Sequence, residues 1–270
     1  MINAHTQQQN RLPGTLPVTN PSRQSRLPDT GSASKLQQQN RLLDSLPATD
    51  YKNLSAQLEL VQLPQGKVLC ESGTVLNYVY FPTTAVISLL YVTEDGASAE
   101  TAVVGNEGML GVSIFMGVET APSQAVVHCA GSAYRLNKHL LKQEFDRSSS
   151  LRQVLLHYTQ ALITHMAQTA VCNRHHSVDQ QLCRWLLSTL DRSSTNELTM
   201  THELIAQKLG VRREGVTDAA GKLRSAGAIR YNRGRITVLN RLQLEKRSCE
   251  CYAVVKHAFD ELIPHKMIAA

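Results

Sequence analysis

The chain has 270 residues, a formal net charge of +6 and 42% hydrophobic residues. That length exceeds the ~100–200 residues of a typical domain, so we expect two domains and connecting segments. No apolar run reaches the ~18 residues that a membrane-spanning helix needs, and residues 1–30 lack the apolar core of a secretory signal. These features exclude membrane-spanning and exported proteins and predict a soluble protein of the cytoplasm.

Positive charge is concentrated in one part of the chain. Residues 174–247 hold fourteen Lys and Arg residues against seven acidic residues, whereas the rest of the chain has a net charge of −1. Localised positive charge is typical of proteins that bind phosphate groups, although a charged run alone also fits a solvated surface. The motifs within this segment decide between the two interpretations.

Six cysteines are scattered along the sequence without a C-x-x-C pair, which argues against a zinc ribbon, a thioredoxin-like site or an iron–sulfur centre. Cys249 and Cys251 are separated by one residue, and such a pair specifies too little geometry for a metal site. His175 and His176 are interpreted as a helix-end pair rather than as ligands. We therefore expect reduced, mostly buried thiols, no metal ion and no cofactor.

Residues 1–40 are polar, contain proline and lack helical or strand periodicity, and QQQNRL occurs at 7–12 and again at 37–42, so a disordered tail is predicted over residues 1–40. From residue 41 a short helical stretch precedes brief β-prone runs between Val61 and Leu136, which are separated by turn residues. No helix of about 10–15 residues fits between consecutive runs, which disfavours a parallel α/β sheet. Residues 41–148 are therefore predicted to form a β-rich roll.

Residues 149–176 change to helical periodicity, with a stripe of residues alternately four and three positions apart. This is the spacing of a seam between paired helices, so the segment is predicted to be a dimerisation helix. Packing of the same stripe against the chain's own roll is the alternative. The predicted seam residues are Leu151, Leu155, Tyr158, Leu162, His165 and Thr169.

Residues 177–241 carry the pattern of a winged helix-turn-helix. Thr201 can cap a helix that ends at Gly210, and a second helix follows over residues 212–225. β-prone runs on either side of residues 232–234 then form a basic hairpin, which is a wing. A helix that fits the major groove and a hairpin that reaches the neighbouring backbone together predict DNA binding. No role is assigned to the C-terminal extension, residues 242–270.

The sequence from about residue 42 to residue 240 resembles the Crp/Fnr superfamily of bacterial regulators, most strongly in LIAQKLGVRREGV and RGRITVL. The resemblance implies an α+β fold with an N-terminal cyclic-nucleotide-binding-like β-roll, a long connecting helix and a C-terminal winged helix-turn-helix. Asp218 stands where the family commonly has a second arginine, so an unusual operator sequence is expected. The implied base-reading residues are Arg213, Glu214, Thr217 and Asp218, and the implied phosphate contacts are Thr201, Arg212, Lys222, Arg224, Arg233 and Arg235.

The roll is expected to sense an effector, but two charged residues of the family's pocket are replaced. The resemblance implies a glutamate for the ribose and an arginine for the cyclic phosphate, and Val112 and Ser123 stand there instead. A buried phosphate would lose a charge-assisted interaction of ~1.5–3 kcal/mol, so cyclic-AMP binding in the usual way is not expected. The effector is unknown or absent, and the candidate pocket residues are Gly108, Gly111, Val112, Ser123, Gln124 and Ala125.

The sequence thus predicts a sequence-specific, dimeric DNA-binding transcription regulator. Its expected partners are double-stranded DNA, a second copy of the chain, an unknown small-molecule effector or none, and RNA polymerase as a further candidate; no membrane is involved. The sequence has no P-loop, G-x-S-x-G or H-E-x-x-H motif, so no enzyme and no catalytic residue is expected. The alternative is a sensor or adaptor module that acts through protein contacts without binding DNA.

Overall fold

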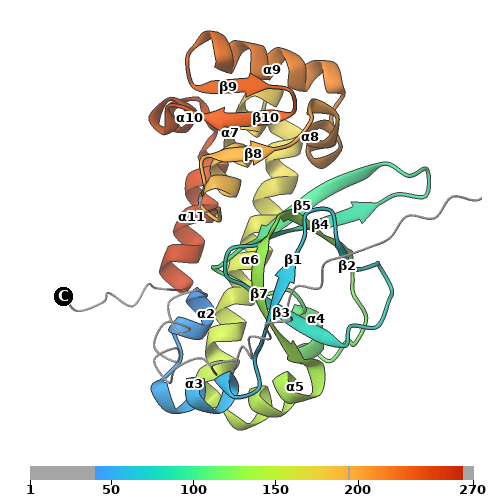
Figure 1. The fold of residues 1–270 in the computed structure, drawn as a ribbon, viewed down its shortest axis with the longest axis vertical. Coiled ribbons are helices and arrows are strands. Elements are labelled where there is room, and N and C mark those ends of the chain that lie inside the picture. The colour runs from blue at the N-terminus through green and yellow to red at the C-terminus, as the bar shows by residue number, and fades with distance from the viewer. Residues whose placement is uncertain (1–39, 194, 264–270) are drawn as a thin grey trace, which may run out of the picture.

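The computed structural model describes residues 40–193 and 195–263. The predicted disordered tail lies outside the described residues except for Asn40, whose side chain caps helix α2 (Arg41–Asp44). The chain forms a β-rich N-terminal domain, a long helix and a helical C-terminal domain with a small sheet (Figure 1). This arrangement confirms the predicted α+β class and the order of its parts.

The N-terminal domain is a roll of antiparallel strands in two sheets, with orders β1-β7-β3 and β2-β6-β4-β5. Apolar and aromatic side chains such as Val79, Phe81 and Ile87 are buried between the strands, which explains why the β-prone runs form sheets. The elements are β1 (Glu59–Leu63), β2 (Val68–Cys70), β3 (Tyr78–Pro82), β4 (Val86–Val92), β5 (Ser98–Val104), β6 (Gln124–Cys129), β7 (Gly131–Asn137), α3 (Ala48–Ser55), α4 (Val112–Phe115) and α5 (Lys138–Arg147).

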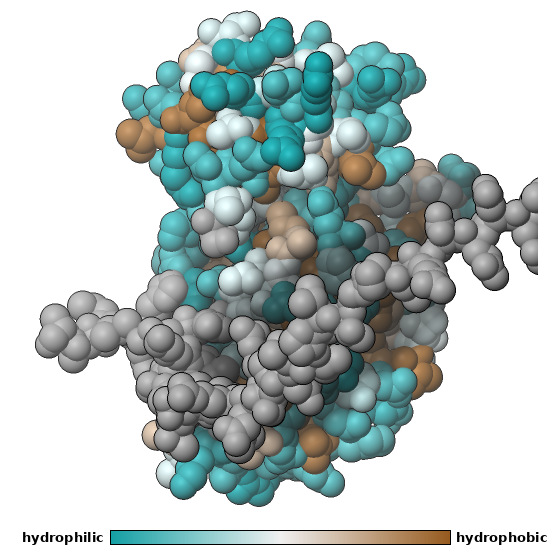
Figure 2. All heavy atoms as spheres, viewed as in Figure 1, coloured by the Kyte–Doolittle hydropathy of each residue, from teal (hydrophilic) through white to brown (hydrophobic). Residues whose placement is uncertain are grey.

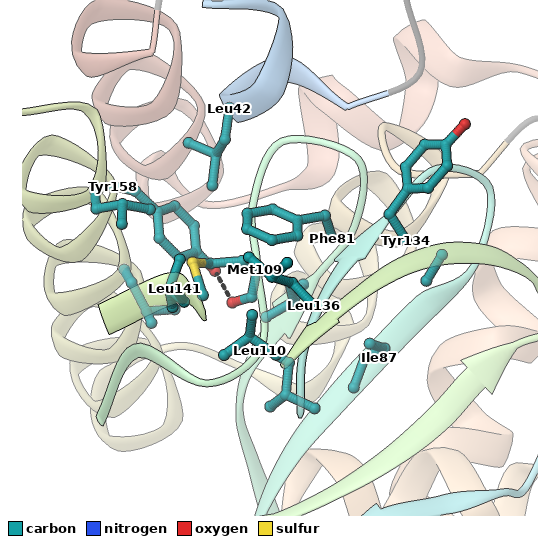
Figure 3. Packing of buried hydrophobic residues seen from close by; sticks show 14 of the residues in the cluster. Leu42, Phe81, Ile87, Met109, Leu110, Tyr134, Leu136, Leu141 and Tyr158 are labelled. Atoms are coloured by element: carbon teal, nitrogen blue, oxygen red, sulfur yellow. Dashed lines mark hydrogen bonds between the residues drawn. The ribbon is translucent and has the colours of Figure 1, made fainter. Parts of the chain in front are cut away.

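Helix α6 (Ser149–His175) connects the two domains. Ser148 caps its first turn by accepting a hydrogen bond from the Leu151 amide at 3.1 Å. The apolar stripe of α6 packs into the core of the roll, where Tyr158 is fully buried and donates to the Met109 carbonyl at 2.8 Å (Figure 3). A Cβ added at Gly108 would lie 2.5 Å from the Tyr158 ring, so this close approach requires a glycine.

The C-terminal domain has a separate hydrophobic core around Trp185. Its sheet has the order β8-β10-β9, so β8 extends the predicted hairpin by a strand that the sequence did not indicate. The elements are α7 (Val178–Leu190), β8 (Glu197–Thr199), α8 (His202–Leu209), α9 (Arg213–Ser225), β9 (Ile229–Asn232), β10 (Arg235–Val238), α10 (Arg241–Arg247) and α11 (Glu250–Leu262).

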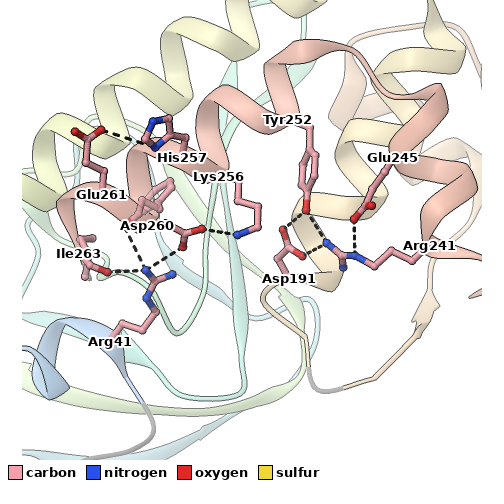
Figure 4. Close-up of polar contacts among 11 residues, drawn as sticks. Arg41, Asp191, Arg241, Glu245, Tyr252, Lys256, His257, Asp260, Glu261 and Ile263 are labelled. Carbon is pink, nitrogen blue, oxygen red and sulfur yellow. Dashed lines mark hydrogen bonds and ion pairs between the residues drawn. The ribbon is translucent and has the colours of Figure 1, made fainter. Parts of the chain in front are cut away.

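The C-terminal extension folds back along α6 (Figure 1). Phe259 of α11 is buried in the core of the roll. Polar contacts hold the extension at two points: Arg41 pairs with Asp260 at 3.2 Å, and Tyr252 donates to Asp191 at 2.8 Å (Figure 4). The extension therefore links α2, α6 and α7. None of the helices in the described ranges combines the length and the hydropathy needed to cross a membrane.

Candidate nucleic-acid interface

Helices α8 and α9 form the predicted helix-turn-helix. Thr201 caps α8 by accepting a hydrogen bond from the Leu204 amide at 3.3 Å. Gly210 ends the helix with left-handed backbone at φ 66°, a conformation that glycine adopts without steric cost. The Val211 amide then donates to the Ala206 carbonyl at 3.0 Å. These local contacts turn the chain sharply and set the start of α9.

The outer face of α9 carries three of the predicted base-reading side chains. Val216 and Leu223 are buried against the domain core and fix the inner face of the helix. Arg213, Glu214 and Asp218 are exposed. The exposed end of the helix thus presents one guanidinium donor beside two carboxylate acceptors, which are the groups that recognise base edges in a major groove.

Thr217 is exposed, but its hydroxyl is already engaged. It donates to the Arg213 carbonyl at 3.0 Å and lies 3.1 Å from His202 Nδ1. The His202 ring stacks on Tyr231 of the wing at a centroid distance of 4.1 Å, and burial together with the Arg213 charge lowers the pKa of His202. Thr217 therefore helps to hold α8, α9 and the wing together. No sequence pattern had marked His202 or Tyr231.

Cationic side chains surround this helix, and the surface over the C-terminal domain, at the top of Figure 2, is largely hydrophilic. Lys222 pairs with Asp179 at 2.9 Å, and Arg235 pairs with Glu197 at 3.3 Å. Both pairs are at the surface, where water weakens them, so a phosphate can replace the carboxylate at little cost. The exposed phosphate candidates that form no ion pair within the described ranges are Arg212, Arg224 and Arg233.

The wing is a tight hairpin. Asn232 pairs with Arg235, which leaves Arg233 and Gly234 as a two-residue loop. Both have positive φ, 45° and 80°, as a type I′ turn requires. The loop places the exposed Arg233 side chain at the tip of the hairpin.

A buried carboxylate joins the helix-turn-helix to the roll. Glu100 of β5 accepts hydrogen bonds from Lys208 Nζ of α8 and from Trp185 Nε1 of α7, each at 2.9 Å. Burial raises the pKa of Glu100, but the charge and the hydrogen bond of Lys208 outweigh burial and hold it below its ordinary value, so the carboxylate is charged at neutral pH. The partners lie 108 and 85 positions from Glu100, and no sequence pattern had indicated the contact.

The candidate effector residues lie in different surroundings. Gly111 has φ 108° and precedes α4, which begins at Val112. Ser123 and Ala125 are buried at the start of β6, and Gln124 between them donates to Glu71 at 2.8 Å. Gly108 instead packs under α6, as described above. Neither Val112 nor Ser123 brings a charge to the roll.

The predicted dimer seam lies on the inner face of α6. All six of its residues are buried within the single chain, against the roll and α11, so they are not available to a second copy. The helical periodicity of residues 149–176 therefore marks the face of α6 that packs against the chain's own roll, which is the alternative given in the sequence analysis. The large apolar side chains of α6 that are exposed are Leu156, Ile163 and Val171, with 51%, 53% and 46% of their surface accessible.

Family profiles match both domains. The profile of the cyclic nucleotide-binding domain matches residues 60–148, and that of the Crp-like helix-turn-helix domain matches residues 180–247. Together these two matches cover more than half of the chain. The global nitrogen regulator of Synechococcus elongatus is 24% identical over 199 residues, which cover 70% of this chain and 90% of that protein.

Solved structures share the fold. A transcriptional regulator of the crp/fnr family from Eubacterium rectale has a TM-score of 0.60 at 18% identity, with 76% of this chain and 96% of that one covered. FixK2 from Bradyrhizobium japonicum has a TM-score of 0.60 at 15% identity, with 71% and 98% covered. The chain belongs to the Crp/Fnr superfamily of transcriptional regulators and carries a Crp-like helix-turn-helix DNA-binding domain.

Proposed function

We propose that this regulator is a cytoplasmic homodimer that binds duplex DNA in a sequence-specific manner through α9 and the wing. The observation that carries the proposal is the exposed face of α9, where Arg213, Glu214 and Asp218 stand beside the basic wing. A helix used only for internal packing has no need of this set of donors and acceptors. We propose no catalytic activity for this protein.

Each group on this surface has a chemical role in the proposal. Arg213 donates both guanidinium arms to a guanine, while Glu214 and Asp218 accept from cytosine amino groups. Thr217 holds the helix in place through its contacts with His202 and the Arg213 carbonyl. Thr201, at the start of α8, and the surrounding cations bind the DNA backbone. The cations are Arg212, Lys222, Arg224, Arg233 and Arg235.

Dimerisation brings two such surfaces together. Leu156, Ile163 and Val171 are spaced by seven and eight residues, so they lie along one face of α6. Pairing two copies of this face buries apolar surface and relates the two α9 helices by a two-fold axis. The corresponding DNA target is a palindrome whose half-sites are separated by about one helical turn, roughly 34 Å.

The roll is the proposed sensor. Val112 and Ser123 supply no charged partner for a cyclic phosphate, so the proposed effector is not cyclic AMP bound in the usual way. A signal received in the roll reaches the DNA-binding domain through α6 and through the contact between Glu100 and Lys208. RNA polymerase is a proposed partner on the promoter.

Selection of bound sequences from a pool of random duplexes tests the function. We expect enrichment of a palindrome with half-sites about 10 base pairs apart. The variant Ile163→Glu places a charge in the seam, so it is expected to sediment as a monomer and to enrich no palindrome. Leu60→Glu changes an equally exposed apolar residue of the roll and serves as the matched control. A dimeric Ile163→Glu variant would contradict the seam, and a pool without enrichment would contradict sequence-specific binding.

A further inference from the structure

A cluster of three cysteines and a histidine lies where α6 meets α11. Cys172 and His176 belong to the last turn of α6 and its C-cap, four residues apart on one face of the helix. Cys249 and Cys251 lie at the start of α11. The four potential ligand atoms all lie within 4.8 Å of one another. We propose that these side chains form a binding site for one zinc ion.

The spacing of the cluster fits a single ion. Cys172 Sγ lies 3.5 Å from Cys249 Sγ, and Cys251 Sγ lies 3.5 Å from His176 Nδ1. A tetrahedral zinc with bonds of ~2.0–2.3 Å has edges of about 3.3–3.8 Å between its ligand atoms. The side chains therefore need little movement to bind the ion. A cluster of several irons needs its cysteines further apart, because the sulfurs must surround more than one metal atom.

The type and burial of the ligands favour a structural zinc site. Cys172 and Cys251 have no accessible surface and Cys249 has 4%, while the His176 side chain has 15%. Thiolate and imidazole are ligands that zinc prefers, and a set of three cysteines and one histidine fills all four of its positions. A site with no open position holds the fold together rather than activating a water molecule.

The groups around the cluster match the needs of such a site. His176 directs Nδ1 at the cluster, and its Nε2 lies 3.3 Å from the Glu250 carboxylate, which fixes the ring as second partners of zinc-bound histidines do. The helix-capping position of Cys249 places its sulfur at the positive end of α11.

This site gives the C-terminal extension a role. His176 immediately precedes Ser177, which caps α7, the first helix of the DNA-binding domain, and Cys172 lies one helical turn before His176. A zinc ion would bind α11 to this junction and hold the two domains in one orientation. The proposal replaces the expectation from sequence that no metal binds. The two neighbouring histidines also differ in their roles. His176 is a proposed zinc ligand, whereas His175 is exposed and lies outside the cluster.

Metal analysis of the full chain tests the site. The protein is purified with reductant, saturated with zinc and dialysed into metal-free buffer, and we expect about one zinc ion retained per chain. Cobalt loaded in its place should give the intense visible bands of tetrahedral coordination and sulfur-to-cobalt charge transfer. Cys249→Ser should lose most of the metal, whereas Cys129→Ser, a cysteine outside the cluster, should retain it.

A pair of variants at one position separates loss of a ligand from loss of the fold. His176→Ala should lose zinc, whereas His176→Cys restores a fourth ligand and should retain it with sulfur-rich cobalt spectra. The proposal is overturned if the wild-type chain retains no zinc, or if Cys249→Ser retains as much as Cys129→Ser. It is equally overturned if the protein purified with reductant still carries a Cys172–Cys249 disulfide, or if it shows the absorption of an iron–sulfur cluster.

Discussion

Replacing Arg213 by alanine is expected to reduce affinity for the preferred duplex by about 5- to 150-fold for each half-site of the palindrome, because each bidentate base contact contributes ~1–3 kcal/mol of discrimination. Arg213 is the first residue of α9, is exposed and forms no ion pair within the described ranges. Affinities are measured by fluorescence anisotropy on duplexes with each of the four base pairs at the contacted position. The variant should bind all four with similar affinity.

Lys222→Ala is the matched control, since it removes one positive charge from the same helix. Lys222 lies four residues beyond Asp218 and pairs with Asp179. As a phosphate contact, its loss should weaken binding to all duplexes alike and reduce the salt slope by about 2, which is about 1 for each chain of the dimer. If the two variants weaken every duplex to the same extent, Arg213 does not read a base.

Glu100→Ala is expected to destabilise the protein by about 3–5 kcal/mol, the usual cost of leaving one charge of a buried pair without its partner. Glu100 is 6% exposed and accepts from both Lys208 and Trp185. Its removal leaves the Lys208 ammonium with the neutral Ser88 hydroxyl as acceptor, at 2.6 Å, in place of a carboxylate, and it leaves the Trp185 indole N–H without the acceptor it has in the wild type. Trp185 is the only tryptophan of the chain, so urea unfolding followed by its emission reports directly on this contact.

Glu59→Ala provides the comparison. Glu59 also pairs with a cation, Arg135 at 2.8 Å, but 58% of the Glu59 side chain and 32% of the Arg135 side chain are exposed. Surface pairs contribute ~0–1 kcal/mol, so this variant should unfold almost as the wild type does. Equal stability of the two variants would mean that the contact between the roll and the helix-turn-helix contributes little to the fold.

The elements that were predicted well depend on local sequence. Gly210 ends α8 because its own backbone adopts the left-handed conformation, and Arg233 with Gly234 closes the wing within two residues. Such signals need no knowledge of the rest of the chain. The helix-turn-helix, the hairpin and the exposed cations of the interface could therefore be predicted from sequence.

The features that were missed depend on contacts between distant segments. The periodicity of α6 showed which face is apolar, but not that the roll and α11 cover it, so the seam was placed on the inner face. Glu100 and Lys208 lie 108 positions apart, and Cys172 and Cys249 lie 77 apart. Residues this far apart in the sequence follow no spacing pattern that would predict a contact. Cys172 and Cys249 come together only because α11 folds back onto α6.

The salt dependence of duplex binding tests the central proposal most directly. The association constant for the selected duplex is measured over a series of salt concentrations. Each phosphate contact contributes a slope of about −0.9 in a double-logarithmic plot, so a dimer that uses about half to all of its ten candidate cations should give a slope of about −4 to −9. A slope near zero, or no binding in dilute buffer, would contradict a DNA-binding surface on α9 and favour a module that acts through protein contacts.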